Sequence, residues 1–140
     1  TVIVWPNAIK KGSSSDQINS TVDIYPTLTS VVGLKPNDSF DGQSFLSTLI
    51  GNELKIEREI YFVRREGNIN YGGKAYHAIR VGDWKLLQNS PYKPLELYNL
   101  KNDPFEKNNL VDEFPEKVSE LNNKLMIHIQ EGGETPWQKK

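Results

Sequence analysis

Four short apolar segments, separated by short polar connections, constrain the fold of this chain more than any other feature. Each segment alternates apolar and polar residues or is rich in β-branched and aromatic residues, as strands are. Gly82-Asp83 joins two of them as a two-residue link of the kind that closes a β-hairpin. The sequence therefore predicts a small antiparallel sheet of about four strands. The expected strands are residues 60–63, 76–81, 84–87 and 95–100.

One long helix is expected after these strands. Pro115 suits a first helical turn, and apolar residues recur beyond it at helical spacing. This apolar stripe is long enough to cover one face of the sheet, so residues 56–140 are predicted to form an α+β subdomain. Gly132-Gly133 is expected to end the helix. The stripe consists of Val118, Leu121, Leu125, Met126 and Ile129.

Residues 1–55 carry a different pattern. Residues 2–5 are β-branched or aromatic and stop at Pro6, which is typical of a strand buried on both faces of a parallel sheet. One such strand cannot stand alone. We therefore expect residues 1–55 to be the edge of a larger α/β domain, and the sequence to be part of a longer protein.

Two helices are predicted within residues 1–55. The first begins at Ser20 or Asp23 as its cap, places Pro26 in its first turn and ends at Gly33. A shorter helix runs from Ser44 to Gly51. The apolar face of the first helix would consist of Ile24, Leu28, Val31 and Val32.

Composition excludes several classes of function. Lys and Arg number 17 and Asp and Glu 18, so the net charge of −1 gives no general attraction to nucleic acid or an anionic membrane. The absence of cysteine excludes disulfides, cysteine zinc sites and thiol nucleophiles within these residues. No apolar run approaches the roughly 20 residues of a membrane-spanning helix. Neither nucleic acid nor a membrane is expected as a partner.

No catalytic motif is found in the sequence. There is no Gly-x-Ser-x-Gly, no phosphate-binding glycine loop before a helix and no His-Glu-x-x-His. His77 and His128 are too few for a multi-histidine metal site, and a packing role on the helix is expected for His128. The aspartates fit caps and turns rather than a metal site. Catalytic and metal-ligating residues are therefore predicted to be absent.

Arg64 and Arg65 open the longest irregular connection of the predicted sheet, and His77 follows that connection. Arginine binds anions through charge-assisted hydrogen bonds, although a solvated loop and a sheet-surface histidine remain alternatives. His77 and Arg80 would point to opposite faces of a regular strand, so they cannot act together. Residues 88–94 form a second connection that could approach a bound molecule.

Several fragments, in this order and spacing, resemble the C-terminal third of a formylglycine-dependent sulfatase, an arylsulfatase-like member of the alkaline phosphatase superfamily. Each fragment alone is a weak signal, but together they cover nearly residues 1–130. The fragments are Ser20 to Leu28, then Gly33, then Asp41 to Phe45, Ala78 to Leu86, Glu96 to Leu100, Asp103-Pro104 with Glu106, and Asn109-Leu110.

The resemblance implies that residues 1–55 edge the catalytic domain and that residues 56–140 form the C-terminal subdomain. Sulfatases hydrolyse sulfate esters with a formylglycine made in a Cys/Ser-x-Pro-x-Arg motif, beside a divalent cation, usually calcium. None of the eight prolines is followed two residues later by arginine. We therefore expect formylglycine and calcium in an upstream part of the parent, no cofactor in this chain, and no activity of this chain alone.

The resemblance also implies partners and a substrate-binding role. The expected partners are the missing N-terminal catalytic domain and a sulfated small molecule or glycan, with a periplasmic, secreted or lysosomal location. Because the small subdomain lies beside the cleft in this family, Arg64, Arg65 and His77 are predicted to bind substrate. Two alternatives stay open: a phosphonate or phosphate ester hydrolase of the same superfamily, and a binding module without chemistry.

Overall fold

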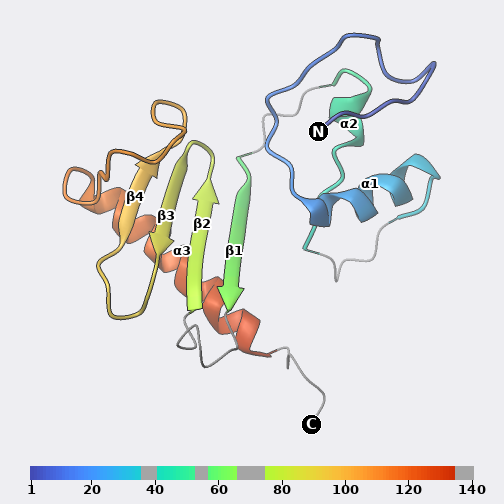
Figure 1. Cartoon of the computed structure of the whole chain (residues 1–140). Coiled ribbons are helices and arrows are strands. Elements are labelled where there is room, and N and C mark those ends of the chain that lie inside the picture. The colour runs from blue at the N-terminus through green and yellow to red at the C-terminus, as the bar shows by residue number, and fades with distance from the viewer. Residues whose placement is uncertain (36–40, 53–56, 66–74, 135–140) are drawn as a thin grey trace. The chain divides into compact units, whose positions relative to one another are not determined.

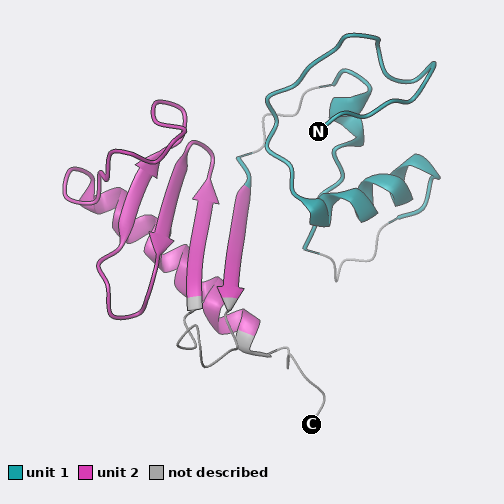
Figure 2. Ribbon diagram, in the orientation of Figure 1, with its two compact units in different colours: residues 1–58 teal, residues 59–140 magenta. Residues whose placement is uncertain are grey.

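The computed structural model describes residues 1–35, 41–52, 57–65 and 75–134, and the chain divides into two compact units (Figure 2). Unit 1 is Thr1–Arg58 and unit 2 is Glu59–Lys140. The boundary predicted between residues 55 and 56 falls within residues 53–56, which lie outside the described residues.

Unit 2 contains a four-stranded antiparallel sheet in the order β1-β2-β3-β4 and a long helix, α3 (Figure 1). Each strand pairs with its neighbour in the sequence, which confirms the predicted sheet. Gly82 has a φ of 56°, the left-handed conformation that a tight two-residue hairpin turn requires. The elements are β1 (Glu59–Arg65), β2 (Ala75–Val81), β3 (Trp84–Gln88), β4 (Glu96–Asn99) and α3 (Pro115–Glu134).

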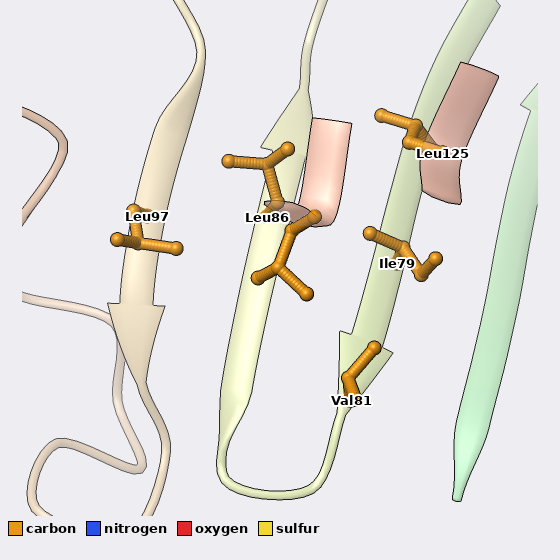
Figure 3. Close-up of a cluster of buried hydrophobic side chains, with 6 residues drawn as sticks. Ile79, Val81, Leu86, Leu97 and Leu125 are labelled. Atoms are coloured by element: carbon orange, nitrogen blue, oxygen red, sulfur yellow. The ribbon is translucent and has the colours of Figure 1, made fainter. Parts of the chain in front are cut away.

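The core of unit 2 lies between one face of the sheet and α3 (Figure 3). Ile79, Leu86 and Leu97 are paired across three strands and form one fully buried row. Leu121 and Leu125 of α3 complete the cluster, as the apolar stripe of the sequence predicted. Full burial of one such side chain contributes about 1.5–3 kcal/mol, so this row holds the helix on the sheet.

α3 continues through Gly132-Gly133, so the prediction that this glycine pair ends the helix is wrong. A glycine ends a helix when it adopts the left-handed conformation. Gly132 does not, because its φ is not among the positive values found in the chain. Glycine only weakens a helix that it continues, by about 1 kcal/mol relative to alanine.

The connection between β4 and α3 covers the outer edge of β4. The backbone N–H of Leu97 donates to Oδ1 of Asn109 at 3.0 Å, and the N–H of Leu110 donates to the carbonyl oxygen of Leu97 at 2.8 Å. The carboxylate of Asp103 accepts the N–H groups of Lys107 and Asn108 and so shapes the connection. Because the backbone N–H and carbonyl groups of Leu97 already have partners, they cannot pair with another strand.

Replacing Asn109 with alanine is expected to lower the free energy of unfolding by about 1 kcal/mol, because the N–H of Leu97 would lose its acceptor. Urea unfolding of the chain measures this loss. Asn108→Ala is the matched control, since this exposed residue donates to Asp103 through its backbone N–H, which alanine keeps. Equal stability of the two variants would contradict a role for the Asn109 side chain.

Unit 1 contains a 3-10 turn, η1 (Thr21–Asp23), and two helices, α1 (Ile24–Val31) and α2 (Leu46–Leu49). Pro26 lies in the first turn of α1, as predicted. Gly33 and Gly51 follow the helices with φ of 74° and 92°, the left-handed conformation expected after a helix end. No helix in the described ranges is long and apolar enough to span a membrane.

Residues 2–5 have no regular structure, so the predicted strand is wrong. A buried parallel strand needs neighbours to pair with, and the described residues of unit 1 form no strand. Val2 is accordingly 90% exposed. The predicted apolar face of α1 is also largely in solvent at Ile24 and Leu28, while Pro26 and Thr27 are buried instead.

Candidate functional site

The predicted substrate-binding residues gather at the end of the sheet where β1 ends and β2 begins. The strand register places Val63 opposite His77, Arg64 opposite Tyr76, and Arg65 opposite Ala75. Because β3 ends and β4 begins at the same end, their connection lies there too (Figure 1). We term this region the β1–β2 end, defined as Arg64, Arg65, residues 75–77 and residues 89–95. Residues 66–74 lie outside the described residues.

Arg64 and His77 lie on opposite faces of the sheet. His77 shares the face of Ile79, which packs against α3, and it is only 6% exposed. Arg64 is exposed and shares its face with Tyr76, because successive strand residues alternate. The side chain of Arg65 lies outside the described residues. The structure therefore brings Arg64 and His77 to one end of the sheet but not to one face.

His77 belongs to a cluster of three rings between the sheet and α3. The hydroxyl of Tyr61 lies 2.7 Å from Nδ1 of His77, and their ring planes are 14° apart. Tyr61 also stacks on His128 of α3, with ring centroids 5.2 Å apart and planes within 4°. His128 thus packs on the sheet, as predicted. We term Tyr61, His77 and His128 the ring cluster.

Glu59 joins β1 to α3 beside the ring cluster. Its carboxylate accepts hydrogen bonds from Nε2–H of His128 at 2.9 Å and from Nζ of Lys124 at 2.5 Å. Partial burial acts to raise the pKa of Glu59, but the hydrogen bonds from Lys124 and His128 outweigh it and lower that pKa below its ordinary value. Glu59 is therefore ionised at neutral pH and fixes the ring of His128.

Sequence reasoning did not find Glu59, Lys124 or Tyr61. Between 65 and 69 residues separate Glu59 from its partners on α3, so no local pattern connects them. The one available signal is that Lys124 and His128 are four residues apart and lie on one helix face.

In unit 1, Asp23 is a fully buried carboxylate. It accepts the N–H of Gln43 at 2.8 Å and the N–H of Ser20 at 2.7 Å, and it forms a buried ion pair with Arg58. Burial acts to raise the pKa of Asp23, but these donors outweigh it and the pKa is lowered. The sequence assigned Asp23 to capping alone, and the pair with Arg58 was missed. Since the chain supplies its donors, Asp23 is a structural group.

The formylglycine motif of sulfatases is absent from the sequence, and the described residues offer no site for the calcium that sulfatases use. Across the described residues, no group of three or more His, Asp, Glu or Cys side chains could hold a metal ion. The sequence has no cysteine and no proline followed two residues later by arginine. An exposed guanidinium group at the β1–β2 end, that of Arg64, is of the kind that donates hydrogen bonds to an anion.

Comparison with known proteins identifies the family. A family model described as "N-sulphoglucosamine sulphohydrolase, C-terminal" matches residues 1–133. The chain belongs to this family of sulfatase C-terminal regions. The match confirms the resemblance drawn from the sequence fragments.

Individual relatives agree with the family. An ulvan-active sulfatase of Formosa agariphila is 30% identical over 137 residues, covering 76% of this chain and 27% of the relative. An N-acetylglucosamine-6-O-sulfatase of Bacteroides thetaiotaomicron is 32% identical over 127 residues, covering 86% of this chain and 23% of the relative. A protein solved in complex with its substrate D-glucosamine-2-N,6-O-disulfate has a TM-score of 0.75 at 27% identity, covering 94% of this chain and 28% of that chain. The chain spans about a quarter of the length of these relatives.

Proposed function

We propose that this chain is the C-terminal part of a sulfuric ester hydrolase and that its β1–β2 end helps to bind a sulfated sugar. The observation that carries the proposal is the family match over residues 1–133, together with relatives that are named as sulfatases. One relative is named an N-acetylglucosamine-6-O-sulfatase, and a similar structure was solved with D-glucosamine-2-N,6-O-disulfate as its substrate, which supports an aminosugar sulfate as the substrate class.

The proposal divides the work between this chain and the rest of the protein. Formylglycine and calcium, which would supply the nucleophile and stabilise negative charge, belong to residues outside this chain. The subdomain is then a scaffold that adds binding groups beside the catalytic domain, its expected partner. Location in the periplasm, in a lysosome or outside the cell accords with this class of substrate.

Arg64 is the strongest candidate for a contact with substrate. It is exposed near the end of β1, and Arg65 follows it as the last residue of that strand. A guanidinium group donates two parallel hydrogen bonds to oxygens of one sulfate or carboxylate group. His77 is nearly buried, so its part in the proposed site is to support the start of β2 from the α3 side.

The test uses the full-length protein and a 6-O-sulfated glucosamine as substrate. Arg64→Ala is expected to raise KM about 10-fold or more with little change in kcat, because a hydrogen bond to a charged group contributes about 1.5–3 kcal/mol. Arg65→Ala is expected to act in the same direction. Arg80→Ala is the matched control, since Nε of Arg80 donates to the carbonyl of Gly82 at the other end of the sheet.

Two outcomes would contradict the proposal. An unchanged KM in both Arg64→Ala and Arg65→Ala would remove the β1–β2 end from the substrate site. Hydrolysis of phosphate or phosphonate esters without hydrolysis of the sulfate ester would assign the protein to the rival reaction of the same superfamily.

A further inference from the structure

The ring cluster connects α3 to the β1–β2 end through a continuous series of contacts. Glu59 holds His128, His128 stacks on Tyr61, and the hydroxyl of Tyr61 meets Nδ1 of His77. These residues come from three elements, β1, β2 and α3, so the connection depends on the helix being packed on the sheet. None of the short fragments that carry the resemblance in the sequence includes Tyr61, His77 or His128.

We propose that Tyr61 and His128 are positioning residues that fix the neutral ring of His77 as the tautomer with its proton on Nε2. An effect on substrate binding, through the support that His77 gives to the start of β2, rests on the proposed function. The tautomer itself does not, because it follows from contacts within unit 2.

In this proposal the hydroxyl of Tyr61 donates to Nδ1 of His77 and so selects the tautomer. A tyrosine hydroxyl ordinarily keeps its proton to a pH near 10, so near neutral pH it can donate to a bare ring nitrogen. At 2.7 Å from Nδ1 it occupies the position of a strong hydrogen bond. When Nδ1 accepts that proton, the single proton of the neutral imidazole must be on Nε2.

His128 keeps Tyr61 in the position from which its hydroxyl can donate. The two rings are parallel within 4°, and Nε2–H of His128 is fixed by the carboxylate of Glu59. Stacking of this kind restrains the tilt of the tyrosine ring. Glu59 also binds Lys124, so two residues one helical turn apart fix the carboxylate that orients His128.

Several titratable groups lie around His77 and His128, and the choice of pH for the experiment must take all of them into account. Glu59 and Tyr61 come from β1, and Lys124 comes from α3. Gln88 of β3, which lies opposite His77 in the register, does not titrate. Glu131 lies three residues beyond His128 on α3. At pH 8, where free imidazole is neutral and the carboxylates are ionised, the tautomer of His77 can be measured without a change in these neighbours.

The experiment is long-range proton–nitrogen NMR of the 140-residue chain at pH 8, with its histidines labelled with nitrogen-15. The wild type is expected to show His77 as one tautomer protonated at Nε2. Tyr61→Phe, which keeps the ring and removes the hydroxyl, is expected to give a mixture of both tautomers. Tyr76→Phe is the matched control and should leave the spectrum of His77 unchanged, because Tyr76 lies on the opposite face of β2.

Two variants of His128 separate stacking from the hydrogen bond to Glu59. His128→Phe keeps an aromatic ring against Tyr61, and it should retain more of the Nε2–H tautomer of His77 than His128→Ala does. A wild-type mixture, or a tautomer unchanged in Tyr61→Phe, would overturn the inference. Equal spectra of His77 in the wild type and in His128→Ala would also overturn the inference.

The link to substrate is tested in the full-length protein. Tyr61→Phe is expected to raise KM for a sulfated glucosamine about 3- to 10-fold while kcat stays near the wild-type value. A KM unchanged in a variant whose tautomer has changed would overturn that link. Absence of any sulfatase activity in the wild type would contradict the proposed function, whereas the NMR result would stand on its own.

Discussion

Asp23→Asn is expected to lower the free energy of unfolding of unit 1 by about 3–5 kcal/mol. The substitution leaves the guanidinium group of Arg58 buried without a counter-ion, and breaking one side of a buried ion pair has a cost in this range. Hydrogen exchange of the Gln43 amide and of the amides of α1 measures the loss within unit 1 itself.

An exposed ion pair provides the control for Asp23. Lys117 and Glu120 are three residues apart on α3 and both are partly in solvent. Glu120→Gln removes that pair and is expected to change stability by less than about 1 kcal/mol. If Asp23→Asn had an effect as small as Glu120→Gln, the ion pair of unit 1 could not be buried in solution.

Asp23 should also make unit 1 sensitive to acid. The pKa of Asp23 is lowered in the folded chain from the ordinary value of 3.8. Its stabilising contribution is therefore complete above pH 3.8 and is lost as the pH falls through the lower folded-state pKa. Asp23→Asn should remove this part of the acid dependence, which hydrogen exchange at decreasing pH would show.

Gly42→Ala is expected to destabilise unit 1 by about 3 kcal/mol or more. A Cβ atom at this position would lie 2.0 Å from the carbonyl oxygen of Val22 and 2.6 Å from its carbonyl carbon. Both are backbone atoms, so no flexible side chain can move aside, and the cost should reach the upper range for overpacking. The turn that carries Gln43 would have to separate from η1, and the hydrogen bond from Gln43 to Asp23 would break.

Gly132→Ala is the matched glycine control. A Cβ at Gly132 meets no atom within 4 Å, and the residue lies in α3. Alanine should therefore stabilise this helix by about 0.5–1 kcal/mol. Urea unfolding and amide exchange should thus show a loss of stability for Gly42→Ala and a gain for Gly132→Ala. Wild-type stability of Gly42→Ala would contradict the close approach of the two backbone segments.

The elements of unit 2 could be predicted because their signals are local. Alternation, or a run of β-branched and aromatic residues, defines β1 to β4. The two-residue link of Gly82 and Asp83 defines the hairpin, and helical spacing defines α3. Residues 2–5 show where such reasoning fails. Their β-branched composition favours a strand, but a strand forms only where another strand pairs with it, and composition does not supply that partner.

The sequence singled out residues for a candidate site, whose binding role stays a prediction, but it did not specify their geometry. Arg64 and His77 flank one connection in the sequence, yet the register of β1 against β2 places them on opposite faces. No pattern in the sequence specifies that register. The contacts of Glu59 and Asp23 were missed for a related reason, since their partners lie 35 to 69 residues away.

The late position of α3 in the chain affects how the subdomain forms during synthesis. The four strands are complete at Asn99, but the helix that covers them ends 35 residues later, at Glu134. At about 5–20 residues per second, a ribosome needs roughly 2–7 s to make that stretch. During that interval Ile79, Leu86 and Leu97 have no helix above them, so the nascent sheet presents its apolar face to chaperones and to neighbouring chains.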